Sequence, residues 1–313
     1  MSFDPREAII SWKSGIQLSS LINGQHDALI IAEMAIGNSD EKLLIEIEPF
    51  LNRAELHFLN FRRAQIGNDA DLALNELTNA LEQSRKSEHR DHLIEARIRM
   101  EHGIIQASLG DSEQAGIDLK WAMERFSALD EGHIWHGIAM INLASWHRAR
   151  NEWAMALAIY SEISRFGPHS IEVIALSRYQ AAEIYLEIGH DVNALRNYWI
   201  AYHGFMDSNM VEQAIESGLH WLDLGLSNVG VDGMSMDELV ESASPRDHNG
   251  VELTICINPD DIKFVFDWMM ENITDFSGES RPDLHVLVDA AEIIGEELNN
   301  NGIEDPTVLV RTN

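Results

Sequence analysis

The sequence predicts an all-α fold in which antiparallel helix pairs stack one after another. Three observations lead to this prediction. Small and bulky residues recur at fixed spacing in three successive segments, turn-forming residues separate the two halves of each segment, and weaker copies of the pattern continue toward both ends. Because three or more stacked repeats are needed to bury a continuous core, these copies together indicate a repeat array.

The composition suits a folded chain of one elongated array, or of an array and a small second domain. Of 313 residues, 45% are hydrophobic and only 7 are proline, which excludes a mainly disordered protein. The single cysteine, Cys256, excludes an internal disulfide, a Cys-rich zinc site and a CxxC redox pair. The first residues lack the basic and apolar regions of a signal peptide, and no apolar stretch is long enough for a membrane helix. We therefore expect a cytoplasmic protein.

The charge of the chain limits its partners. Against 52 acidic residues there are 22 basic ones, which gives a net charge of −30. This charge repels phosphate backbones and anionic membrane surfaces, so we expect neither a nucleic-acid nor a membrane partner. It attracts cationic proteins or peptides, although an acidic surface also serves solubility alone.

The strongest repeats lie within residues 92–206, in the segments 96–126, 138–166 and 176–205. The first helix of each has a small residue at its middle: Gly103, Ala144 and Ala182. The second helix of each has a small, a bulky and an apolar residue in turn: Ala115, Leu119 and Ala122; Ala156, Tyr160 and Ile163; Ala194, Tyr198 and Ala201. Small side chains let two helix backbones approach closely, and the bulky residue fills the remaining groove.

Turns and weaker copies extend the array. Helix breaks are predicted at 110–112, 150–152 and 189–191, where glycine, asparagine and aspartate favour a helix end and a new start. Second-helix patterns recur earlier in the chain, at Ala28, Ala32 and Ala35 and at Ala73, Leu77 and Ala80. Val211 to Leu226 predicts a further first helix with Gly218 at the small position, and Ser235 with Glu238 predicts a capping box.

The pattern resembles the tetratricopeptide repeat family. The best match is the segment 187–195, preceded by Ala182 and Tyr185 and followed by Tyr198 and Ala201. The spacings of 41 and 38 residues between equivalent alanines exceed the usual 34, and such long periods resemble the repeats of bacterial peptide-responsive regulators and of transcription-activator sensor arms. The resemblance implies a tetratricopeptide-like α-solenoid of antiparallel helix pairs over residues 1–243.

Residues 250–313 follow a polar breaker run at 243–250 and are predicted to form a small C-terminal cap. Apolar residues alternate over 251–257, which predicts a strand, and helices are expected after Pro259 and after Pro282. Residues 307–310 could form a closing strand. The cap is therefore either α/β or helical, and a divergent last repeat is the alternative. A strand at 251–257 on an exposed edge could pair with a second copy of the chain.

No catalytic, cofactor or metal site is predicted. The sequence lacks the P-loop, GxGxxG, HExxH and GxSxG motifs. His136 and His147 lie roughly 16 Å apart along one helix, too far to share an ion, and His92 with Glu95 would need ligands from another helix. An enzyme that uses carboxylates on a helical scaffold remains an alternative without a motif. We expect a protein without enzymatic activity.

In the family that the sequence resembles, the first helix of each repeat lines a concave binding face. Carried over to this chain, the resemblance implies a face made of twelve residues: Arg97, Met100, Ile104, Ile138, Ile141, Asn142, Ser145, Arg148, Leu176, Tyr179, Gln180 and Glu183. Apolar residues mixed with Asn, Gln and Arg suit an extended or helical peptide. The expected function is a scaffold that binds a protein or peptide segment. The alternative is a sensor whose superhelix changes shape when a ligand binds, and a merely solvated concavity also fits these residues.

Overall fold

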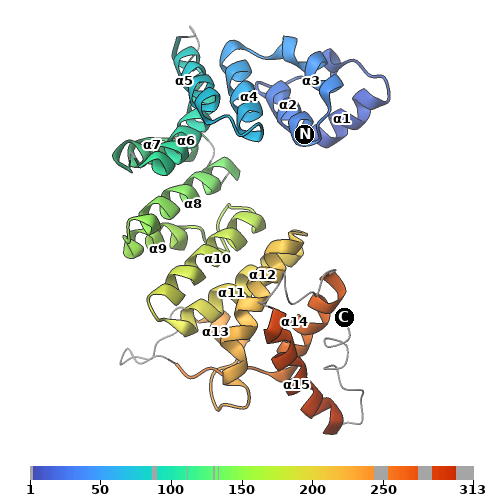
Figure 1. Cartoon of the computed structure of the whole chain (residues 1–313), viewed down its shortest axis with the longest axis vertical. Helices are drawn as coiled ribbons and strands as arrows, with labels where there is room; N and C mark the ends of the chain where they lie inside the picture. The colour runs from blue at the N-terminus through green and yellow to red at the C-terminus, as the bar shows by residue number, and fades with distance from the viewer. Residues whose placement is uncertain are drawn as a thin grey trace. The chain divides into compact units, whose positions relative to one another are not determined.

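The described part of the chain folds into α-helices. The computed structural model describes residues 3–86, 90–110, 112–129, 131–132, 134–242, 253–273 and 284–300, the last five of these without their side chains. These residues form fifteen α-helices and three short 3-10 turns, and no strand (Figure 1). The predicted all-α repeat fold is confirmed.

The chain divides into two compact units, which are described separately. The N-terminal unit comprises residues 1–131 and the C-terminal unit residues 132–313. The predicted boundary at 243–250 lies outside the described residues and stays a prediction.

The N-terminal unit consists of seven helices: α1 (Pro5–Lys13), α2 (Asp27–Gly37), α3 (Glu41–Ile47), α4 (Arg53–Ile66), α5 (Ala70–Lys86), α6 (His92–Leu109) and α7 (Ser112–Leu129). Consecutive helices pack as pairs, α4 with α5 and α6 with α7. One apolar core joins α1, α2 and α3, and a second lies among α4, α5 and α6.

The C-terminal unit consists of eight helices: α8 (Ile134–Ala149), α9 (Trp153–Glu162), α10 (Ile171–Glu187), α11 (Asp191–Asp207), α12 (Val211–Gly225), α13 (Met236–Glu241), α14 (Pro259–Asn272) and α15 (His285–Asn300). Helix α8 pairs with α9 and α10 with α11. Its main core runs from α10 to α15 and includes the fully buried Trp221 and Tyr202.

The repeat positions carry the packing that their spacing predicts. Every alanine, leucine, tyrosine and isoleucine of the second-helix pattern in α7, α9 and α11 is buried. A Cβ at Gly103 would lie 2.8 Å from Leu119 Cγ, so α6 and α7 approach too closely for a side chain there. Gly218 is also closely packed, because a Cβ would lie 2.4 Å from the mobile end of the Met269 side chain and 3.1 Å from the ring of Tyr202. Small residues therefore determine how closely each pair packs.

The turns between paired helices use left-handed backbone. Gly110, Asn151 and Gly189 have φ angles of 89°, 59° and 74° and lie at the three predicted breaks. Asn68 between α4 and α5 has the same conformation, with φ of 55°. Glycine and asparagine adopt this conformation at the least cost, which explains why these residues end the helices. The predicted capping box is also present, with Glu238 N–H donating to Ser235 Oγ.

The C-terminal region corrects one prediction. Its described residues contain no strand: Ile255 and Ile257 form only isolated parallel bridges, with Met234 and Val229. Both isoleucines are buried, so their alternation with exposed residues has the period of a strand although only two residues pair. Helices α14 and α15 pack against each other and against α12, so the described part of the cap is helical. The predicted strand at 307–310 lies outside the described residues.

Candidate functional site

The twelve predicted face residues lie in both units. Arg97, Met100 and Ile104 belong to α6 in the N-terminal unit, and the other nine belong to α8 and α10 in the C-terminal unit. Arg97 and Met100 are buried, with 3% and 2% of their surface exposed. Arg97 donates two hydrogen bonds to the Glu33 carboxylate, at 2.6 and 2.8 Å, and lies over the ring of Phe58. In this structure, Arg97 and Met100 belong to the packing of their own unit.

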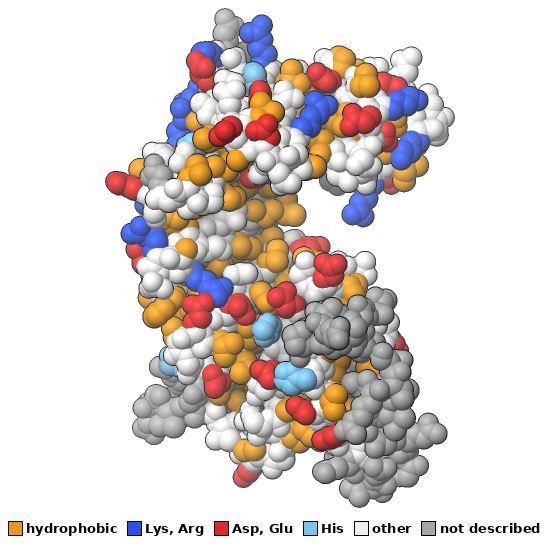
Figure 2. Space-filling view, viewed as in Figure 1, with side chains coloured by type: hydrophobic (Ala, Val, Ile, Leu, Met, Phe, Trp, Pro, Cys, Tyr) orange, Lys and Arg blue, Asp and Glu red, His pale blue; other side chains and the backbone are white. Residues whose placement is uncertain are grey.

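The nine residues of α8 and α10 are accessible. All are half-buried: Ile138, Ile141, Asn142, Ser145, Arg148, Leu176, Tyr179, Gln180 and Glu183. Figure 2 shows hydrophobic side chains over α8, with acidic and histidine side chains beside them over α10 to α12. We call these nine residues the α8–α10 face.

Arg148 connects the two helices of this face. Its guanidinium donates to Gln180 Oε1 at 3.2 Å and to Glu187 Oε1 at 3.1 Å, and lies 3.6 Å from Glu183. Burial opposes the charged form of Arg148, but the Glu187 carboxylate outweighs it and raises the pKa of the arginine. In contrast, the amide of the half-buried Asn142 has no hydrogen-bond partner among the described residues.

Hydroxyl groups from the second helices reach this face at equivalent positions. Tyr160 of α9 lies 3.3 Å from Ser145 Oγ, and Tyr198 of α11 donates to the Glu183 carboxylate. Each pair is separated by 15 residues, and the two pairs are 38 residues apart, as the repeats are. The matching pair in the preceding repeat is Ile104 and Leu119, which is apolar. The bulky second-helix residue is thus a tyrosine whose hydroxyl reaches the face in both repeats of the C-terminal unit, and a leucine at the equivalent position of the N-terminal unit.

An aromatic cluster continues the face onto α12. The His220 ring stacks on Tyr198 at a centroid distance of 5.1 Å, and Tyr179 packs edge-on against Tyr198 at 5.7 Å. Burial raises the pKa of Tyr198, and Glu183 raises it further. Burial likewise raises the pKa of Tyr179, together with Glu216. Both phenols therefore stay protonated and act as hydrogen-bond donors to carboxylates.

A small cavity of about 170 Å³ adjoins this cluster between α12 and α15. His220 and two acids of α12, Glu216 and Asp223, line it together with His285 and Val286 of α15. Sequence reasoning missed these residues. The recurrence of tyrosine at the equivalent positions 160 and 198 could have indicated that Tyr198 contributes to the site. No sequence pattern indicated that α15 packs beside α12.

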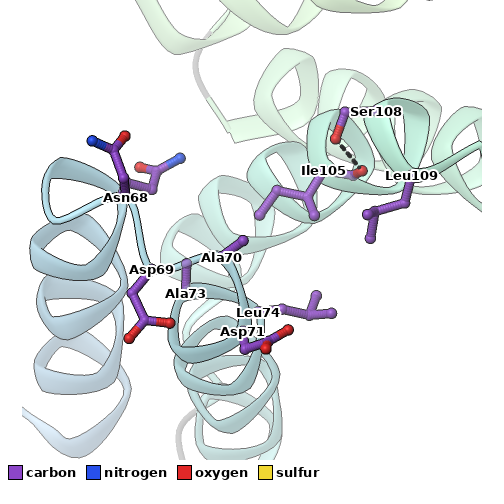
Figure 3. A pocket seen from close by; sticks show the side chains of 10 residues that line it. Asn68, Asp69, Ala70, Asp71, Ala73, Leu74, Ile105, Ser108 and Leu109 are labelled. Atoms are coloured by element: carbon purple, nitrogen blue, oxygen red, sulfur yellow. Dashed lines mark hydrogen bonds between the residues drawn. The ribbon is translucent and has the colours of Figure 1, made fainter.

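The N-terminal unit has a separate cavity of about 410 Å³ between the α4–α5 turn and the last turn of α6 (Figure 3). Leu74, Ile105 and Leu109 form its apolar side, and Ser108 Oγ donates to Ile105 O at 2.7 Å within α6. The three predicted residues of α6 do not line it.

The described residues show neither a metal site nor a membrane-spanning helix. They contain no group of three or more His, Cys, Asp or Glu side chains placed to hold a metal ion. None of their helices combines the length and the apolar character that crossing a membrane requires.

Comparison with known proteins supports the fold. No protein-family model matches the chain, and neither does any curated protein sequence. Among solved structures, the chain is similar to a Rap protein complexed with competence and sporulation factor, with a TM-score of 0.50 and 14% identity over 99% of this chain and 96% of that chain. This likeness supports a tetratricopeptide-like repeat fold. BtubC from P. vanneervenii also matches, at 12% identity over 97% of this chain and 94% of that chain, but its TM-score of 0.33 is too low to support an argument.

Proposed function

We propose that the chain binds a peptide or protein segment along the α8–α10 face and acts as an interaction scaffold rather than as an enzyme. The observation that carries this proposal is the unpartnered amide of Asn142 on a half-buried helix face. The Asn142 amide is not among the side-chain groups that are buried without a partner, so water reaches it. It is therefore available to exchange that water for one donor and one acceptor of an extended peptide backbone. Ile141 and Leu176 supply apolar contact beside it.

Charge favours a cationic segment. Glu183 and Glu216 act on the tyrosines of the aromatic cluster, Glu187 lies beside Arg148, and this arginine supplies one positive charge against the three acids. The net charge of −30 attracts such a segment from a distance. The similar Rap protein was crystallised with a bound factor, which is consistent with a binding role for this fold.

Binding of short labelled peptides to the full chain, measured by fluorescence anisotropy, tests the proposal. Basic peptides should bind and acidic peptides of the same length should not. Asn142→Ala should weaken the binding about tenfold, because one to two hydrogen bonds are lost. Ser161→Ala, which changes an exposed polar residue on the second helix α9, is the matched control. Equal affinities of the Asn142→Ala variant and the parent would exclude this face.

A sensor role is the second candidate, and one contact favours it. His220 both stacks on Tyr198 and lines the cavity shared with α15. A ligand bound beside Tyr179 would therefore alter the contacts of His220 on α12, the helix against which α14 and α15 pack. Hydrogen–deuterium exchange with and without a bound peptide separates the candidates: a sensor changes its exchange in α14 and α15, and a scaffold only in α8 to α12.

A further inference from the structure

Three arginines of the C-terminal unit come together without a carboxylate. Arg165 precedes α10, Arg178 lies on α10 and Arg196 on α11, and none forms an ion pair with an acidic residue in the described part of the chain. The other two described arginines of this unit are paired, Arg148 with Glu187 and Arg150 with Glu152. In a chain with 52 acidic residues, an arginine cluster without a counter-charge calls for an explanation.

A shared acceptor shows that Arg165 and Arg196 are neighbours, and the charges of both act on Arg178. Val240 O accepts hydrogen bonds from Arg165 at 3.4 Å and from Arg196 at 3.0 Å. Arg196 also donates to Ser242 O, at 2.6 Å, so it holds the end of α13. Burial lowers the pKa of Arg178, and the charges of Arg196 and Arg165 lower it further.

The carbonyl partners compensate only part of the charge. Arg178 donates to Tyr160 O at 3.3 Å and to Ile163 O at 2.6 Å, at the end of α9. A helix end carries at most about half a negative charge, so the ends of α9 and α13 leave roughly two of the three positive charges unbalanced. The Arg196 Nε–H donor is also buried and lacks an acceptor among the described residues.

The cluster is accessible from solvent on one side. Arg165 is exposed, and the ring of the neighbouring Phe166, which Arg165 lies over at 5.4 Å, is 91% exposed. Arg178 and Arg196 are half-buried behind them. An anion that approaches past Arg165 thus enters an environment where water screens its charge less.

We propose that Arg165, Arg178 and Arg196 form a binding site for a phosphate dianion. Guanidinium groups match the geometry of phosphate oxygens, which they bind through paired N–H donors. A phosphate monoester carries about −1.5 to −2 charges at pH 7, which balances the uncompensated charge of the cluster. A carboxylate carries one charge and balances half of it. The site is separate from the α8–α10 face, so it stands independently of peptide binding there.

The test is calorimetric titration of the full chain with inorganic phosphate, in buffers matched in ionic strength with sodium chloride. Saturable binding is expected, and acetate should bind more weakly. Arg165→Gln should weaken phosphate binding about tenfold or more, because a charge-assisted hydrogen bond is lost from an exposed residue that the fold does not need. Arg196→Gln, checked for folding by circular dichroism, should do the same.

Arg150→Gln is the matched control, since it removes one positive charge of the same unit outside the cluster. It should change the affinity by no more than about twofold, because salt screens an exposed distant charge. The proposal is overturned if phosphate does not bind saturably, if acetate binds as well, or if Arg150→Gln and Arg165→Gln have equal effects.

A second titration, with a short phosphoserine peptide, shows whether the site binds free phosphate or the phosphate group of a protein segment. If the site serves a phosphorylated protein segment, this peptide binds more tightly than inorganic phosphate, and Phe166→Ala removes the difference. If the site serves free phosphate, the two probes bind equally and Phe166→Ala has no effect. Either result keeps the arginine cluster as the site.

Discussion

The two units use equivalent helices of the repeat in opposite ways. In the N-terminal unit, charged residues of α6 form ion pairs within the unit. Arg97 pairs with Glu33, and the fully buried Glu95 pairs with Arg85 and Arg90. In the C-terminal unit the corresponding residues of α8 and α10 stay half-buried, and the Asn142 amide stays without a partner. The same helix packing thus buries Arg97 and Met100 in one unit, although Ile104 on the same helix is exposed, and leaves the equivalent residues half-buried in the other. We call the first arrangement closed and the second open, and position within a repeat does not decide between them.

The largest effect is expected at His26, which belongs to the closed unit. Its ring lies 2.9 Å from Glu55 and 3.3 Å from Asp91, linking the start of α2 to α4 and to the start of α6. Burial lowers the pKa of His26, but the Asp91 and Glu55 carboxylates outweigh burial and raise it from 6.5 to about 9. Because the folded-state pKa exceeds the unfolded one, protonation stabilises the fold fully below pH 6.5 and is lost as the pH rises through 9.

This loss should amount to about 3 kcal/mol of unfolding free energy, measured by urea denaturation at pH 6 and above pH 9. His26→Asn should remove that part of the pH dependence, since asparagine tolerates the left-handed backbone at this position, where φ is 77°. His57→Asn, at a more exposed histidine paired with Glu76, is the control. A parent protein whose stability does not change over this range would contradict the expectation.

A smaller effect is expected when the same charge is removed from each unit. Arg97→Met should lower the unfolding free energy by about 2 kcal/mol, because two charge-assisted hydrogen bonds to Glu33 are lost in a buried place. Arg148→Met should cost less than about 1 kcal/mol, because water solvates the glutamates of an open face. Chemical denaturation of both variants measures the difference. Equal losses would show that the two faces are not closed and open as we describe them.

The smallest effect is expected from the repeat-equivalent tyrosines. Tyr198→Phe should destabilise the C-terminal unit by about 1 kcal/mol, because its hydroxyl donates to a carboxylate. Tyr160→Phe should cost about half of that, since Ser145 is a neutral partner at 3.3 Å. Thermal melting of the two variants compares them, and a larger effect at Tyr160 would argue against the difference between the repeats.

More of the fold than of the candidate site could be predicted from the sequence. Gly103, Ala156 and Ala194 were predictable as packing positions because close helix approach demands small residues at a repeated spacing. The alternation over 251–257 led to the wrong prediction of a strand, because two buried isoleucines in an extended segment have the same period as a strand. The division after residue 131 falls at a turn where Gly132 has a φ of 86°, like the glycines at the other breaks between helices, so the sequence does not distinguish it from them.

The chemistry of the site depends on contacts that the sequence does not display. Arg97 was expected on an accessible face, and its burial depends on Glu33, which lies 64 residues earlier. The hydrogen bond from Tyr198 to Glu183 joins α11 to the facing helix α10, and it forms because the phenol is long enough to span the gap between them. The arginine cluster connects the segment before α10, α10 itself and α11 with the ends of α9 and α13, and no spacing along one helix indicates it.

The residue pairs 104 and 119, 145 and 160, and 183 and 198 occupy one structural position in three successive repeats, yet they are apolar, hydroxyl-bearing and acidic in turn. Helix spacing depends on the neighbouring alanines and glycine together with the buried second-helix member of each pair, since Leu119 Cγ is the atom that a Cβ at Gly103 would meet. A change of chemistry at this position must therefore keep a side chain that fits between the paired helices, because Leu119, Tyr160 and Tyr198 are all buried there. Divergence among copies of the repeat is limited to what the groove can hold.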